Sequence, residues 1–437
     1  MRKLIVTERV IISLLVLFLL VLPISGSNLD PTRESEQIRA YSRIYEFDYV
    51  SWTISALARK FVQAGLDVGR YLPNQEKHDL VIEYLDLSNQ ANQLRGQLSN
   101  LIAAPDRKDQ GELESDLRDK LIEKTSQRSD LAPFVEQILQ DQINTALVDL
   151  ELSLGGQLVP PVLYRSDPNS YALIVSPREE IRQAANLMLV RGMTLDEIVG
   201  LEVAIEDNLD LSALVVGIGG VGLYPSMIIE SPNLDWLIHV ISHEWTHNYL
   251  TIRPLGANYN SSPELTTINE TIADLSADDI QRRTFQLFYP EYLPPEGETN
   301  GPAPQSDSET VRESAPDLEI PVQVQPFDFR EQMHITRLEV DRLLADGLIG
   351  EAEAYMEMRR GLFWDNGYQI RKLNQAYFAF HGSYAADPGG AANQEGADLG
   401  SLLRQLKASS SSYRDFMLQV AWKWRLDQFE ELFEGMD

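Results

Sequence analysis

The stretch His243-Glu244-Trp245-Thr246-His247 places two imidazoles four residues apart with a carboxylate between them. On an α-helix both rings lie on one face, where they can bind the same zinc ion. Glu244 then stands beside the open coordination position, as a general base requires. The preceding residues 234–242 are apolar enough for a buried helix, and Asn233 or Asp235 is a suitable cap.

A third ligand is expected from a second helix, 23 residues further on, where Glu270 and Asp274 are again four residues apart. If this helix begins at Ser262-Pro263, with serine as cap and proline in its first turn, Glu270 lies about two turns inside it. Both carboxylates then face the same way, one toward the metal and one toward a ligand histidine. The alternative is that Thr267 and Glu270 form a capping box at a later helix start.

These segments resemble the gluzincin zinc metallopeptidases, which couple an H-E-x-x-H helix to a helix of the form N-E-x-x-x-D, here Asn269-Glu270 through Asp274. The similar part is residues 205–290. The resemblance implies a small zincin-like sheet beside the active-site helix. It implies the following roles: His243, His247 and Glu270 as ligands of Zn2+, Glu244 as general base, and Asp274 and Asn269 as their supports. A looser similarity to exported aminopeptidase-like proteins appears at Lys372–Ala376 and Gly382–Tyr384.

The residue types predict peptide-bond hydrolysis. Zinc acidifies a bound water and polarises the substrate carbonyl, and Glu244 takes the water proton and returns it to the leaving nitrogen. The oxyanion needs a donor opposite the metal. Candidates in the C-terminal third are His334, Tyr368, Tyr377, His381 and Tyr384. We favour Tyr384 or His381 because both lie in a turn-like stretch, with a structural hydrogen-bonding role as the alternative.

A glycine-rich stretch precedes the metal helix and has the form G-x-G-x-x-G at Gly217, Gly219 and Gly222. A dinucleotide site is excluded because residues 224–229 read as a further strand, whereas such a site needs a helix there. Residues 215–223 are therefore either a peptide-binding edge strand, with Gly219 and Gly220 against the substrate main chain, or a plain β-hairpin.

The N-terminus reads as a targeting segment. Arg2, Lys3 and Arg9 flank residues 10–22, a run in which only Ser13 is not strongly apolar. This pattern predicts export with the positive flank left in the cytoplasm. Residues 25–27 offer a cleavage site without alanine, so residues 1–27 are either a retained membrane anchor, which we favour, or a cleaved signal peptide of a secreted protein.

Composition limits the partners and the ligands. The chain has 437 residues, no cysteine and a net charge of −29. The lack of cysteine excludes disulfides and thiolate zinc sites, and the negative charge argues against nucleic acid or anionic membrane surfaces as partners. No sequence feature sets an oligomeric state.

The overall expectation is an α+β protein with a helical region on each side of the catalytic core. A helical N-terminal arm is expected at 28–158, the core at 159–289, a flexible acidic proline-rich loop at 290–327 and a helical region at 328–437. In the core, strands are expected at 171–175 and in the glycine-rich stretch, around a helix near 177–208. The apolar seam of a helical hairpin in the arm comprises Tyr84, Leu87, Ala91, Leu94, Leu98 and Leu101, answered by Leu113, Leu117 and Leu121.

The sequence therefore predicts a zinc metallopeptidase, with an aminopeptidase as one form, that acts on peptide or protein substrates outside the cytoplasm. The alternative is a non-catalytic, zinc-stabilised receptor or assembly protein at the membrane, built around the helical arm.

Overall fold

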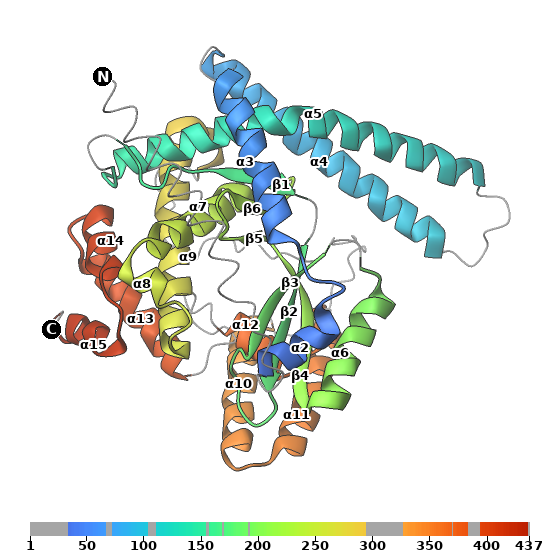
Figure 1. Cartoon of the computed structure of the whole chain (residues 1–437), viewed down its shortest axis with the longest axis vertical. Helices are drawn as coiled ribbons and strands as arrows, with labels where there is room; N and C mark the ends of the chain where they lie inside the picture. Colours follow the sequence, from blue (N-terminus) through green and yellow to red (C-terminus); the bar gives the residue numbers. More distant parts are fainter. Residues whose placement is uncertain are drawn as a thin grey trace, which may run out of the picture.

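The computed structural model describes residues 34–66, 72–103, 111–153, 157–167, 170–190, 193–293, 327–368, 370–382 and 394–435. The protein is α+β, with two three-stranded sheets among many helices. The sheets lie in the middle of the molecule and a helical hairpin projects to one side (Figure 1). The targeting segment, nearly all of the acidic loop and Tyr384 fall outside the described residues. No helix in the described part is both long and apolar enough to cross a membrane.

The first sheet has β2 (Ser170–Pro177) between β3 (Ala185–Leu189) and β4 (Leu211–Ile218), antiparallel to both. The strand expected at 171–175 is confirmed. It is buried on both faces, because α12 (Gln375–His381) covers Ala172 and Ile174 while other helices cover Leu173 and Val175.

The helices on that other face are α2 (Glu34–Ser42) and α6 (Leu195–Leu209). The helix expected near 177–208 is wrong in its first half, because β3 occupies part of that range. The helix begins only after Thr194, whose side chain accepts a hydrogen bond from the Glu197 N–H in a capping box. The strand pairing of β3 thus overrides the helical reading of this segment.

The second sheet has the order β1-β6-β5 and lies against the H-E-x-x-H helix. β1 (Tyr164–Asp167) runs parallel to β6 (Ser226–Ile229), and β5 (Gly220–Val221) pairs with β6 in the antiparallel sense. The glycine-rich stretch passes from one sheet to the other at Gly219. Its first half belongs to β4 of the first sheet, and its second half, β5, forms a short hairpin with β6 in the second sheet.

The projecting hairpin consists of α4 (Asn74–Ala103) and α5 (Gly111–Asp149), which pack along each other as the apolar seam predicts. The seam does not extend to Leu113, which is 50% exposed. Before the hairpin, α3 (Tyr49–Leu66) packs against both sheets through Trp52 and Ala56, and Lys60 further along it pairs with Glu136 of α5.

The C-terminal helices form two groups with different neighbours. One group packs beside the first sheet, and the other packs against the helices of the candidate site (Figure 1). The first group comprises α10 (Phe329–Ala345), α11 (Ile349–Asp365) and α12; the second comprises α13 (Gln394–Ser409), α14 (Tyr413–Ala421) and α15 (Leu426–Glu434).

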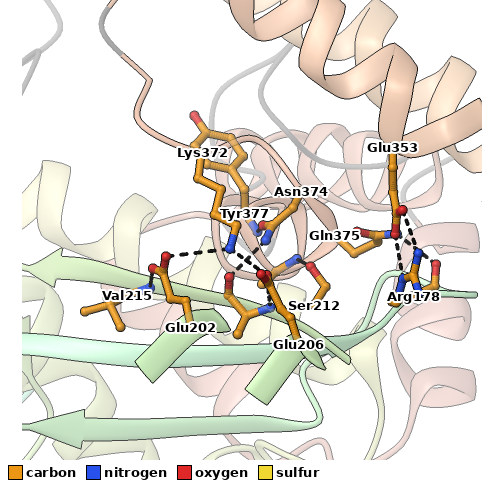
Figure 2. A network of polar contacts seen from close by, with 12 residues as sticks. Arg178, Glu202, Glu206, Ser212, Val215, Glu353, Lys372, Asn374, Gln375 and Tyr377 are labelled. Carbon is orange, nitrogen blue, oxygen red and sulfur yellow. Dashed lines mark hydrogen bonds and ion pairs between the residues drawn. The ribbon is translucent and has the colours of Figure 1, made fainter. Parts of the chain in front are cut away.

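The segment before α12 binds the outer edge of β4 through Arg371 and Asn374, and we call these contacts the latch (Figure 2). Glu202 is 1% exposed, accepts the Val215 N–H at 2.6 Å and pairs with Arg371 at 2.5 Å. Arg371 also donates to the Val215 carbonyl, and Asn374 donates to the Ala213 carbonyl at 3.0 Å. Side chains thus occupy the backbone hydrogen-bonding groups of residues 213 and 215 at the edge of β4. Those residues do not offer a free edge to a peptide.

We expect Glu202→Gln to lower the free energy of unfolding by about 2 kcal/mol, because a buried carboxylate loses its charge-assisted bonds to Arg371 and to the Val215 N–H. Glu206→Gln is the matched control. Glu206 pairs with Lys372 where both side chains are partly exposed, so its loss should change stability by less than about 1 kcal/mol. Chemical unfolding of the two variants measures the difference. Equal effects would show that the buried pair does not anchor the latch.

Candidate metal centre

The H-E-x-x-H segment lies in α7 (Leu234–Thr251), a helix buried for most of its length. Asn233 caps it by accepting the Trp236 N–H, as one of the two cap predictions stated. The Trp245 indole is 2% exposed and donates to the Pro160 carbonyl at 2.9 Å. The core thereby fixes the rotation of the helix.

The second helix is α9 (Pro263–Phe288), and it begins at Ser262-Pro263 as predicted. The Ser262 hydroxyl accepts the Leu265 N–H, and Thr267 lies well inside the helix, so the alternative of a later start is wrong. α9 packs directly on α7. Their contact includes a buried hydrogen bond of 3.0 Å between the hydroxyls of Thr246 and Ser276.

The helix contact brings the three predicted ligands together. His243 Nε2 and His247 Nε2 are 3.0 Å apart, and Glu270 Oε2 lies 3.3 Å from the first and 3.5 Å from the second. Four-coordinate zinc with bonds near 2.0–2.1 Å separates its ligand atoms by about 3.3 Å. Glu270 Oε2 is also a buried oxygen without a hydrogen-bond partner. Donor types, spacing and this oxygen all fit a zinc ion.

Asp274 lies behind the cluster, with its Oδ1 2.8 Å from His243 Nδ1. A carboxylate there holds the proton on Nδ1 and turns the Nε2 lone pair toward the centre of the cluster. Burial alone would lower the pKa of His243, but Asp274 and Glu270 outweigh burial and raise this pKa well above its ordinary value. The two histidines in turn keep the pKa of Glu270 low despite its burial.

Glu244 is 8% exposed and is not one of the three clustered ligands. Burial raises its pKa, and the neighbouring histidines only partly oppose this effect. A carboxylate with a raised pKa holds a proton more readily at neutral pH, which suits a group that must accept and return one.

His239 lies one turn before His243 and faces two carboxylates. Its Nε2 is 3.8 Å from Asp274 and its Nδ1 is 3.6 Å from Asp278. Each carboxylate thus faces a different nitrogen of the His239 ring. His239, His243 and Asp274 also lie close enough together to form a second possible group of ligands. α7 and α9 therefore run antiparallel, with a row of histidines facing a row of acids.

The glycine-rich stretch passes closely over the cluster. A Cβ atom on Gly220 would lie 2.6 Å from Glu244 Oε1, and one on Gly222 would lie 3.2 Å from His247 Cβ. A Cβ atom on Gly219 would lie 2.7 Å from the Trp236 indole. Glycine at these positions therefore allows the backbone to approach the metal helix. Of the predicted substrate-binding residues, Gly220 lies beside Glu244 and Gly219 lies beside Trp236.

Sequence reasoning missed Tyr259, whose hydroxyl donates to Glu270 Oε1 from the loop before α9. The Tyr259 carbonyl accepts from Thr266 at 2.7 Å, which fixes the loop. Only its nearness to the helix start hinted at this role. Asn269, in contrast, points to the other side of α9, where its amide donates to the carbonyls of Leu265 and Leu255. It ties α9 to α8 (Pro254–Ala257) and contacts neither histidine.

The oxyanion candidates lie further away. His381 ends α12 with its ring against Tyr377 and Phe380, and among the described residues it does not contact the three ligands. Burial lowers its pKa to about 4, so it is neutral at pH 7. Tyr368 packs on Phe329 in the α10–α11 core.

A cleft of about 540 Å³ separates the end of α12 from the start of α9. Thr267, one turn before Glu270, lines one wall, and Ala379 and Gly382 line the other. Gly382 comes two residues before Tyr384 in the sequence. Gly382, which follows α12, therefore lies at the wall of the cleft.

Comparison with known proteins adds no assignment, because no family model, no curated protein sequence and no solved structure matches the chain.

The geometry predicts about one tightly bound zinc ion per chain. His243→Ala, His247→Ala or Glu270→Ala should each abolish binding, measured as metal content after dialysis. Asp274→Asn should weaken zinc affinity by roughly ten- to a hundred-fold. His239→Ala, on the same helix face, is the control and should keep the ion. Full zinc content in Glu270→Ala would disprove the third ligand.

Proposed function

We propose that the protein is a zinc-dependent peptide hydrolase that acts outside the cytoplasm. The observation that carries this proposal is the agreement between the three donor separations, 3.0, 3.3 and 3.5 Å, and the separation that tetrahedral zinc requires. Glu244 lies between His243 and His247 in the sequence and is a buried acid that is not itself one of the three donors. The proposal keeps the gluzincin resemblance and a zincin-like core as its structural interpretation.

Zinc, when bound, supplies an acidified water and polarises the scissile carbonyl. Glu244 accepts the proton of that water and donates it to the leaving nitrogen. Asp274 and Tyr259 orient ligands: Asp274 faces His243 Nδ1, and Tyr259 donates to the Glu270 oxygen that faces away from the histidines. The proposed reaction forms no covalent bond between enzyme and substrate.

The substrate main chain is proposed to pair with β5. This strand lies at the end of its sheet, and its glycines bring the backbone against Glu244. The edge of β4 at residues 213 and 215 is satisfied by the latch, which leaves the later part of the glycine-rich stretch for this role. Backbone pairing gives affinity for extended peptides without selecting side chains.

The oxyanion donor is proposed to be Tyr384 or His381, the last residue of α12. The argument is the position of Gly382 on the cleft, opposite the helix turn that precedes Glu270. A phenol hydroxyl there donates a hydrogen bond to the developing negative charge. Because His381 is neutral, it can donate a hydrogen bond to the oxyanion but does not attract it as a positive charge would.

Glu244→Gln separates metal binding from hydrolysis. The variant should keep about one zinc per chain and lose about 10²- to 10⁴-fold in kcat/KM on a peptide library, because the proton acceptor is gone. Zinc content and hydrolysis are measured on the same preparation. A wild type with zinc but without hydrolysis would favour the non-catalytic, zinc-stabilised protein, and an active Glu244→Gln would refute the mechanism.

Gly220→Ala tests the close approach of the backbone to Glu244. The added methyl displaces the carboxylate, so kcat/KM should fall by about a hundred-fold while zinc is retained. Gly217→Ala is the matched control in the same stretch, because a Cβ atom there meets nothing within 4 Å. Equal activity of the two variants would remove the glycine-rich stretch from the active site.

A further inference from the structure

One side of α3 is bound firmly to the protein core. Trp52 packs with Met188 and Met227, and its indole donates to Asp167 at 2.7 Å. Further along the same helix, Lys60 pairs with Glu136 at 2.5 Å, and both side chains are at most 6% exposed. Figure 1 shows α3 lying across the second sheet. The orientation of the helix is therefore fixed by its own contacts.

Another face of α3 is apolar and exposed. Val50, Ile54 and Leu57 follow the i, i+4, i+7 spacing and are 59%, 64% and 43% exposed. They form one stripe about two turns long. A stripe of large aliphatic residues on the surface of a helix whose other face is already buried indicates contact with an apolar partner.

The charges around this stripe distinguish it from other exposed aliphatic residues. α3 contains no Asp or Glu in 18 residues, although the chain has 66 of them. α6 has a stripe of similar exposure at Leu195, Val199 and Val203, but Asp196 and Glu197 are exposed beside it. Asp48, just before α3, is exposed, but α3 has no acid of its own, whereas α6 carries acids along its length. A helix with an apolar stripe and no acid of its own suits the interface of a lipid bilayer.

We propose that the Val50–Leu57 face of α3 lies on a lipid bilayer as an interfacial helix. This inference rests on the membrane attachment proposed above. If residues 10–22 enter the bilayer, residues 23–33 can span at most about 40 Å before α2 begins. This tether keeps α2 and α3 near the same surface. The occupant is a neutral interface, because the net charge of −29 opposes anionic lipids.

The docked helix also positions the candidate metal centre. Trp52 and Ala56 pack with Val221 and Leu223, which belong to the stretch that passes over Glu244. One helix and one strand thus separate the bilayer from the proposed catalytic base. The substrate class that follows is a peptide segment close to the membrane surface.

The test uses the full chain in phosphatidylcholine vesicles. Because the chain has no cysteine, Ile54→Cys and Leu195→Cys each carry a single nitroxide label. The two sites are matched, with exposed fractions of 64% and 63%. Collisions of the label with oxygen, which concentrates in lipid, are compared with collisions with a water-soluble nickel chelate. We expect oxygen to dominate at Ile54 and the nickel chelate at Leu195.

Equal, water-like accessibility at both sites would overturn the proposal, and so would a chain that does not float with the vesicles. Protection of the label at Ile54 from both reagents also overturns the proposal. If the label's spectrum then shows spin–spin broadening, a second copy of the chain covers this face of α3. Without broadening, a segment of the same chain covers it. Zinc content and hydrolysis are measured on the same samples. A wild type without hydrolysis refutes the proposed function and leaves the lipid contact standing.

Discussion

The antiparallel contact between α7 and α9 is the interaction on which the candidate centre depends. Each helix presents one polar residue per turn toward the other, so that a row of imidazoles faces a row of carboxylates. Carboxylates are expensive to bury unless opposite charges or hydrogen bonds compensate. The close approach requires small residues at the crossing, and Thr246 and Ser276 supply a hydrogen bond there. The capped helix starts and the core around Trp245 hold this geometry.

The glycine-rich stretch meets three requirements in a few residues. It must continue a buried strand, change from one sheet to the other, and pass within contact of Glu244. Side chains at Gly219 or Gly220 would collide with α7, whereas Gly217 has open space. The latch from the segment before α12 satisfies the first part of the strand, and only the later part remains for another chain. The latch and the bend thus locate any added strand beside the metal cluster.

The parts of the fold with strong local signals could be predicted from the sequence. Cap chemistry located the start of α9, and apolar periodicity located the hairpin. The helix expected near 177–208 was wrong in its first half, where the short strand β3 pairs with β2, and its second half is α6. Tyr259 was missed because a loop residue reveals its partner only after folding. Lys372–Ala376, noted for its resemblance to a peptidase segment, contributes Asn374 to the latch, while its Lys372 pairs with Glu206 of α6.

The protons of the cluster explain why a cation suits its centre. Asp274 faces His243 Nδ1, so a neutral His243 keeps its only proton there and presents a lone pair at Nε2. That lone pair meets Glu270 Oε2 and His247 Nε2 within 3.3 Å and 3.0 Å. With both Nε2 atoms unprotonated, three acceptors this close together repel one another unless a positive charge lies between them. Asp274 and Glu270 attract a proton to His243 and raise its pKa despite its burial. A divalent ion would contact all three acceptors at once, and this is the physical reason to propose zinc.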